Sequence, residues 1–133
     1  DHAGIDKAVL RQIATKPTQF GVLMRTAEAI RAGELGERAQ RKLIPFPSVH
    51  PDDPELMAHP EEIAAKGFKG ITFHPYYQDF LLDDPARWPM FRKIADLGLV
   101  VECHCGLDLG YPTRFDACGP KEVATLLRNV PGL

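Results

Sequence analysis

Two hydrophobic patterns alternate along this chain: short runs of apolar, β-branched residues, and longer stretches whose apolar residues recur at helical spacing. The first helical stretch lies between residues 21 and 32, where the recurring residues are Val22, Leu23, Ala27 and Ile30. The same reasoning predicts helices at residues 21–32, 60–66, 88–97 and 120–128, and strands at residues 5–10, 43–49, 69–74 and 99–104.

Glycine and proline mark the boundaries of these elements. Gly67 and Gly98 follow two of the predicted helices, where a left-handed residue commonly ends a helix. Pro45 and Pro47 interrupt the predicted strand at residues 43–49, and each proline removes a hydrogen-bond donor from a sheet. That segment is therefore an awkward central strand.

Strands that alternate with helices at this spacing predict βαβ units, and so an α/β fold with a parallel sheet. The crossover connections should be right-handed. A chain of 133 residues without a low-complexity segment or an evident linker is long enough for one domain, and we assign residues 1–133 to it.

Composition narrows the class of protein. The net charge of −2 gives no electrostatic reason to bind nucleic acid or an anionic membrane. No apolar run approaches the roughly 20 residues that cross a bilayer, and the first residues do not resemble a secretory signal. Three cysteines, an odd number, fit a reducing compartment, so the cytoplasm is the expected location.

Three histidines occupy equivalent places in the predicted pattern. His74 and His104 are the last residues of predicted strands, and His50 directly follows a third strand. Because the carboxyl ends of parallel strands open onto one face, these imidazoles should meet where α/β enzymes place their sites. A single histidine in such a place is more often a loop residue bonded to a carbonyl, but three together favour a shared site. His59 is outside the pattern and is expected to be a solvated surface residue.

Strand alternation places Glu102 and His104 on one face and Cys103 on the other. Glu102 could orient the imidazole or hold a metal-bound water; equally, it could be a buried polar group satisfied by a lysine or by water.

The sequence Cys103-His104-Cys105 is not expected to form a zinc site, because consecutive strand residues diverge and structural zinc sites use wider pairs. Cys103 is predicted to pack against the outer helices. Cys105 and Cys118 are placed on loops at the functional face, with no base that would make either a nucleophile.

These residues also carry a family resemblance. Residues 70–78, followed by residues 82–85, resemble the fourth-strand segment of the amidohydrolase-2 family, and residues 99–106 resemble its fifth-strand segment. Residues 3–9 and 49–51 are similar to its second strand and to the end of its third. The resemblance covers nearly the whole chain in the correct order.

The resemblance implies part of a (β/α)8 TIM barrel, roughly strands 2–5 with their helices, in a metal-dependent hydrolase. A divalent metal, zinc above all, would activate water to attack a small C–N or C–O bond of a small-molecule substrate. His104 would be the metal ligand with Glu102 beside it, and the predicted substrate contacts are His74, Gln78, His50 and Arg114. A metal-dependent decarboxylase and a non-catalytic half-barrel scaffold are the alternatives. Arg114 would suit an acidic substrate, although an arginine in such a loop is more often a surface residue.

The sequence departs from the family pattern in three respects. Glu102 replaces a position that is usually apolar in relatives. Thr72 stands where relatives often have lysine. The family's first-strand His-x-His pair, sixth-strand histidine and eighth-strand aspartate are not in the chain, and a complete barrel takes about 250 residues. We therefore expect the chain to be a fragment of a longer amidohydrolase-like protein, or else to cover its open sheet edges by association, with a homo-oligomer as the first candidate. The chain alone is expected to be inactive.

Overall fold

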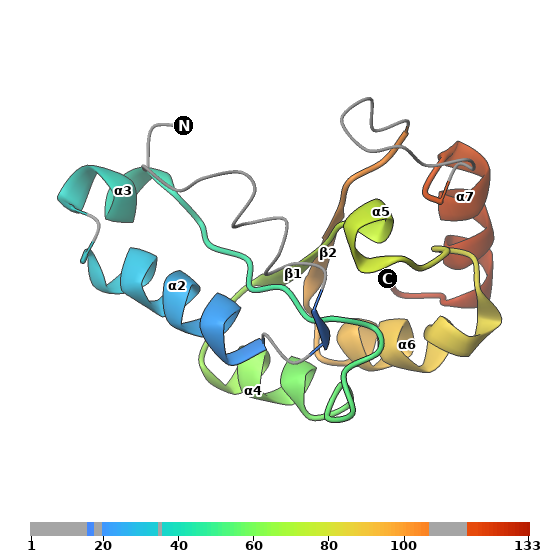
Figure 1. Cartoon of the computed structure of the whole chain (residues 1–133), viewed down its shortest axis with the longest axis horizontal. Helices are drawn as coiled ribbons and strands as arrows, with labels where there is room; N and C mark the ends of the chain where they lie inside the picture. Colours follow the sequence, from blue (N-terminus) through green and yellow to red (C-terminus); the bar gives the residue numbers. More distant parts are fainter. Residues whose placement is uncertain (1–15, 18–19, 35, 107–116) are drawn as a thin grey trace.

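The structure of the chain is a computed structural model that describes residues 16–17, 20–34, 36–106 and 117–133. The first predicted strand, at residues 5–10, lies outside the described residues. The elements of Figure 1 are, in chain order, α2 (Phe20–Ala32), α3 (Glu37–Lys42), α4 (His59–Ala65), β1 (Gly70–Phe73), α5 (Pro75–Gln78), η2 (Pro85–Arg87), α6 (Trp88–Asp96), β2 (Val100–Cys103) and α7 (Pro120–Asn129).

The two strands form a parallel sheet, as the sequence predicts. β1 and β2 pair in register from Gly70 opposite Val100 to Phe73 opposite Cys103, and α6 makes the connection between them. The described residues thus contain one βαβ unit. That the chain forms part of a barrel stays a prediction.

The predicted strand at residues 43–49 is wrong in extent. Only Ser48 pairs with the sheet, in an isolated parallel bridge to Thr72, and Thr72 N–H donates to the carbonyl of Pro47 at 3.0 Å. Pro45 and Pro47 have no N–H to donate, so this segment lies beside β1 without forming a ladder of hydrogen bonds with it.

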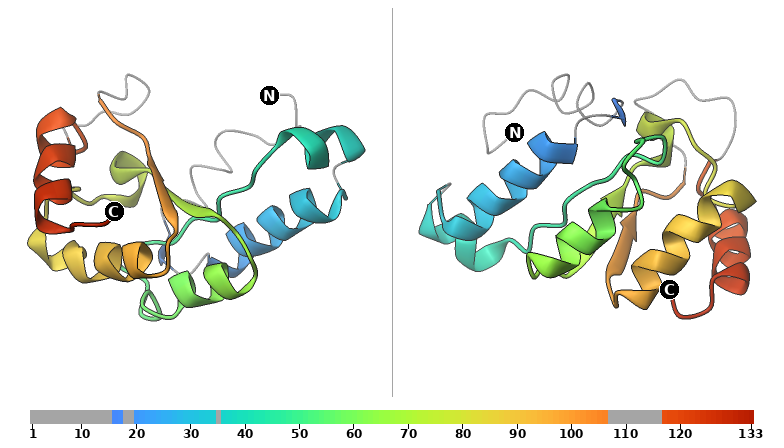
Figure 2. Two further views of the ribbon diagram at one scale, coloured as in Figure 1. Left: turned by 180° about the vertical axis from the view of Figure 1, so that it is seen from behind. Right: turned by 90° about the horizontal axis from the view of Figure 1, so that it is seen from below.

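Helices α4 and α6 lie side by side against one side of the sheet, while α2 and α7 lie at opposite ends of the molecule (Figures 1 and 2). Burial of apolar side chains at this junction supplies most of the driving force for folding. The fully buried members of the core include Ile63 of α4, Phe91 and Ile94 of α6, and Ile71 and Phe73 of β1.

Both helices end in the same motif, which confirms the predicted roles of Gly67 and Gly98. The two glycines have positive φ, 77° and 66°. Gly67 N–H donates to Ala64 and Phe68 N–H to Ile63, and residues 98 and 99 repeat this pattern at the end of α6. This is a Schellman motif, and it directs the chain from each helix into the strand that follows.

His59 is buried, so its predicted surface location is wrong. His59 is the first residue of α4. Its ring stacks on Phe20 of α2 with centroids 3.7 Å apart, and its Nε2 lies 3.2 Å from Oδ2 of Asp53. The sequence around His59 carries no signal that an aromatic ring from another helix would cover it.

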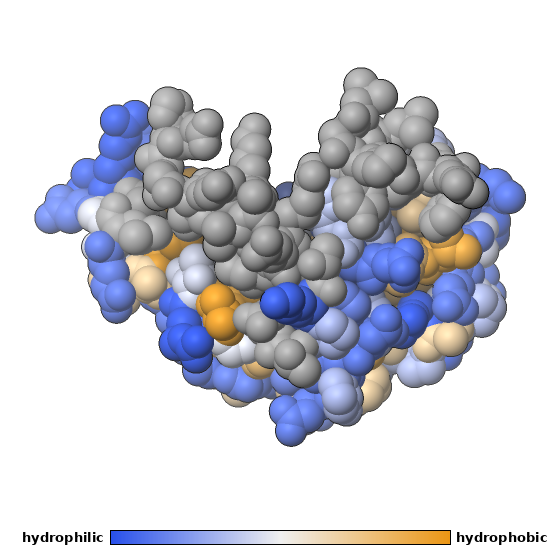
Figure 3. All heavy atoms as spheres, in the orientation of Figure 1, coloured by the Kyte–Doolittle hydropathy of each residue, from blue (hydrophilic) through white to orange (hydrophobic). Residues whose placement is uncertain are grey.

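Several large apolar side chains remain exposed. Val100 of β2 is 57% exposed and Leu127 of α7 is 49% exposed, and hydrophobic atoms reach the surface near α7 in Figure 3. The homo-oligomer expected from the sequence stays a prediction. No helix in the part of the chain that the structure describes has both the length and the apolar character needed to span a bilayer.

Candidate functional site

His74 and His104 each follow the last residue of a strand, and the structure brings their rings together. The N–H of His104 donates to the carbonyl of Phe73 at 3.1 Å, which extends the sheet by one bond beyond β2. The two imidazoles stack with centroids 4.3 Å apart and an angle of 8° between the planes. The sequence-based expectation that strand ends bring these two residues to one place is therefore met by the geometry.

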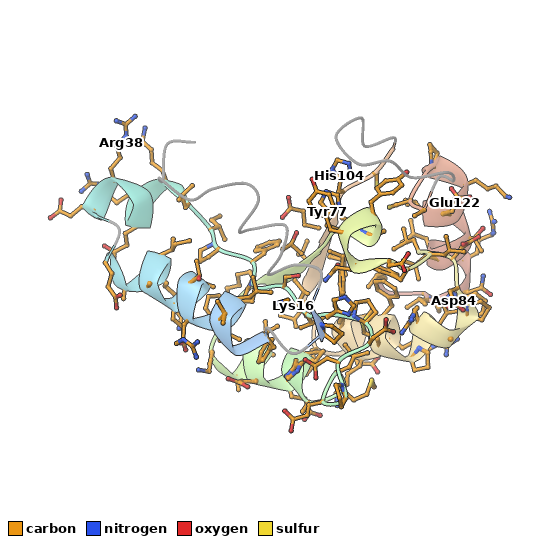
Figure 4. All side chains as sticks on the ribbon, in the orientation of Figure 1. Lys16, Arg38, Tyr77, Asp84, His104 and Glu122 are labelled. Atoms are coloured by element: carbon orange, nitrogen blue, oxygen red, sulfur yellow. The ribbon has the colours of Figure 1, made fainter. Side chains whose placement is uncertain are left out.

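Two tyrosines that sequence reasoning did not assign a role complete this arrangement. Tyr77 stacks on His74 with centroids 3.6 Å apart and planes within 5°, so Tyr77, His74 and His104 form a stacked column with His74 in the middle. Tyr76 presents an edge-on contact to both imidazoles. Figure 4 shows Tyr77 and His104 close together beside α5. Their position directly after His74-Pro75 was the sequence signal that could have pointed to these two tyrosines.

The side chain of Gln78 holds the backbone of His74, the middle residue of the column. Its Oε1 accepts from the N–H of His74 at 2.8 Å, and its Nε2 donates to the carbonyl of Val49 at 2.7 Å. A further contact of 3.4 Å reaches Oγ of Ser48. Because the side chain is only 1% exposed, these contacts favour a positioning role for Gln78, which ties His74 to the segment that ends at Val49.

His50 is buried in a turn. Its ring is 7% exposed, and its Nδ1 accepts from the N–H of Asp52 at 3.1 Å. Burial lowers the pKa of His50 below its ordinary value of 6.5; Asp52 and Asp53 oppose this shift, and the nearby Arg87 guanidinium adds to it. His50 is therefore favoured in the neutral form, as its role as a hydrogen-bond acceptor requires.

A His50→Asn variant should lose part of the pH dependence of stability. A histidine with a lowered folded-state pKa contributes stability that is present above its unfolded pKa of about 6.5 and is lost as the pH falls through the folded value. Asparagine can still accept from Asp52 N–H but does not titrate. Urea unfolding measures the free energy of unfolding at about pH 8 and about pH 5. We expect it to fall less between these two pH values in the variant than in the wild type. Equal losses would show that His50 does not carry this linkage.

Glu102 lies on β2 opposite Thr72 and its side chain is exposed, as is that of His104. The alternative in which Glu102 is a buried polar group is wrong. Its carboxylate can reach solvent on the same face as His104, since residues two apart on a strand share a face. Arg114 lies outside the described residues.

The expectation about the cysteines needs correction. The ring of His104 does diverge from Cys103 and Cys105, since it stacks on His74. The sulfurs of Cys103 and Cys105, however, both approach Cys118, at 3.3 Å and 3.1 Å. Cys118 belongs to the segment just before α7, and this approach depends on a tertiary fold that short-range spacing does not encode.

His104 fits the role of a metal ligand in one respect: its imidazole is exposed at the carboxyl end of a parallel strand, where ring nitrogens can reach a cation. The described residues do not complete a histidine or carboxylate centre around it, and within them the one group of three converging donor atoms is the cysteine group. Further donors for a cation at His104 would have to come from other parts of the protein.

The two imidazoles lie at the carboxyl ends of parallel strands, which is the face where α/β enzymes place their sites. Residues 14–133 match the family model described as Amidohydrolase, so the chain belongs to the amidohydrolase family. This is a metal-dependent hydrolase type of family whose fold is TIM-barrel-like and whose members typically use divalent metals. No curated protein and no solved structure matches the chain.

Proposed function

We propose that this chain contributes to the active site of a metal-dependent hydrolase, with His104 as a ligand of a divalent cation, zinc above all. The observation that carries the proposal is the stacked pair of His74 and His104 at the carboxyl ends of two adjacent parallel strands. When bound, such a cation supplies an activated water for attack on a small C–N or C–O bond.

The residues around His104 hold it in place. Tyr77 fixes the plane of His74, and His74 in turn supports one face of the His104 ring. Stacking restrains the ring planes but leaves the ring nitrogens at the edges, where a ligand or a substrate can be contacted. Preorganised ligands bind metal more tightly than ligands that must be ordered on binding.

The remaining site residues receive roles from their placement. Half-buried His74 is proposed to contact substrate, while buried Gln78 acts through it. Exposed Glu102 is proposed to accept a proton from the attacking water or to orient the imidazole. His50 and Arg114 stay predicted substrate contacts, and His50 can act only from its buried turn.

Metal analysis of a His104→Ala variant tests the proposal. The protein that contains this chain together with the remaining metal donors is loaded with Zn²⁺ and dialysed, and its metal content is measured per chain, with His50→Asn as a control that also removes one histidine. We expect the His104 variant to lose one equivalent and the control to keep it. A small panel of amides, esters and lactones should show hydrolysis that falls with the metal. If the His104 variant retains all of its metal, the assignment of His104 is wrong.

A further inference from the structure

The three cysteines of the chain form a compact group of thiols that the proposed hydrolase chemistry does not use. All three donor atoms lie within 4.8 Å of one another, although Cys118 is 15 and 13 residues away from the other two. None is in a disulfide. They differ in access, since Cys118 is fully buried, Cys103 is half-buried and Cys105 is exposed.

Backbone hydrogen bonds fix the segments that carry these thiols. Cys103 ends β2 and is paired with Phe73, and the N–H of Gly106 donates to the carbonyl of Cys118 at 2.8 Å. The carbonyl of the preceding Ala117 accepts from Leu82 N–H at 3.1 Å. The three sulfurs therefore converge from two backbone segments that are already held against each other.

One of the three thiols lies beside the N-terminus of a helix. Cys118 directly precedes Gly119, the N-cap of the ten-residue helix α7, and the N-terminus of a helix stabilises negative charge. Glu122 fixes this start of α7 by accepting from Gly119 N–H at 3.0 Å. Cys103 and Cys105 also border a cavity of about 550 Å³, which is lined mostly by apolar residues such as Val101, Val123 and Leu126.

We propose that Cys103, Cys105 and Cys118 bind one Zn²⁺ ion through three thiolates. Three thiols release three protons to solvent as the ion binds, and a water molecule takes the fourth tetrahedral position. Zinc–sulfur bonds of about 2.3 Å in a tetrahedron place sulfurs about 3.8 Å apart. The sulfurs of Cys103 and Cys105, which lie 3.3 Å and 3.1 Å from that of Cys118, therefore need to move away from it by about 0.5 Å and about 0.7 Å. A disulfide would instead require about 2.05 Å and would leave one thiol unused.

This site is distinct from the one at His104. The ring of His104 stacks on His74, whereas the sulfurs of Cys103, at the end of β2, and of Cys105, just beyond it, both approach Cys118. A zinc ion there would link the carboxyl end of β2 to the start of α7, and so stabilise the strand end from which His104 projects.

Cobalt substitution tests the proposal, because thiolate ligands give Co²⁺ an intense sulfur-to-metal charge-transfer absorption that histidine and carboxylate ligands do not give. The reduced protein is titrated with Co²⁺ alone and then with Zn²⁺ as competitor. We expect one equivalent with the charge-transfer band, loss of that band in Cys105→Ser, and an unchanged band in His104→Ala. Cys105 is chosen because it is exposed, so its replacement should leave folding intact.

Alkylation of the thiols gives a second measurement that does not require a variant. Zn²⁺ should slow the reaction of Cys105 with iodoacetamide in the wild-type protein, as followed by mass spectrometry. The proposal is overturned if Co²⁺ binds without the band, if Cys105→Ser keeps the band, or if the thiols react equally fast with and without Zn²⁺. A band that survives in His104→Ala with no loss of a second equivalent would refute the proposed ligand role of His104 alone.

Discussion

Replacing Gly70 with alanine should destabilise the protein by about 3 kcal/mol, the upper part of the range for overpacked sites. A Cβ at this position would lie 2.5 Å from the carbonyl oxygen of Val100 and 2.5 Å from Cε2 of Phe46. The phenyl ring can rotate away, but the carbonyl belongs to the paired strand and cannot move without opening the sheet between β1 and β2. Urea unfolding followed by the fluorescence of Trp88, the single tryptophan, measures the change.

Gly21→Ala is the matched control for this change. Gly21 lies in the first turn of α2, and among the described residues a Cβ there would meet Nη1 of Arg25 alone, at 3.6 Å. Alanine is the better helix former, so we expect a gain of about 0.5 kcal/mol. Equal effects of the two substitutions would show that the close approach of β1 and β2 at Gly70 is not a constraint on the fold.

The sequence predicts most of the elements around the site because each has a local signal. Helical spacing of apolar residues locates α2 and α6, and Gly67 and Gly98 locate the turns into β1 and β2. Those two strands carry His74 and His104 at their carboxyl ends, so strand topology alone is enough to predict that the imidazoles meet.

The features that the sequence does not predict depend on tertiary contacts. α5 is a single turn that starts at Pro75, and four residues are too few to show helical periodicity. His59 is buried because Phe20, from a helix 39 positions earlier, covers its ring. Cys118 approaches Cys103 and Cys105 only because α7 returns to the carboxyl end of β2. The sequence pattern places Cys103 against the outer helices and the other two cysteines on loops, so it does not predict this approach.

The family match and the site geometry support each other at different levels. The match assigns a metal-dependent hydrolase type of family, without placing any side chain. The geometry places the exposed ring of His104 at the carboxyl end of β2, where it stacks on His74. It also shows that this support depends on one buried amide, because Gln78 fixes the backbone of His74 and His74 stacks against His104. Stability and ligand placement should therefore respond together when that amide is removed.

A Gln78→Leu variant should lose about 3 kcal/mol of stability. Leucine has a similar volume, but it leaves the N–H of His74 and the carbonyl of Val49 without their buried partner, and each unsatisfied group costs about 1–3 kcal/mol. Gln40→Leu is the control, because Gln40 also donates to a backbone carbonyl, that of Arg31 at 2.9 Å, but on an exposed surface. Its cost should stay within about 0.5 kcal/mol. Urea unfolding compares the two variants, and near-UV circular dichroism reports the aromatic column. If both leucine variants are equally stable, Gln78 does not hold His74 in place.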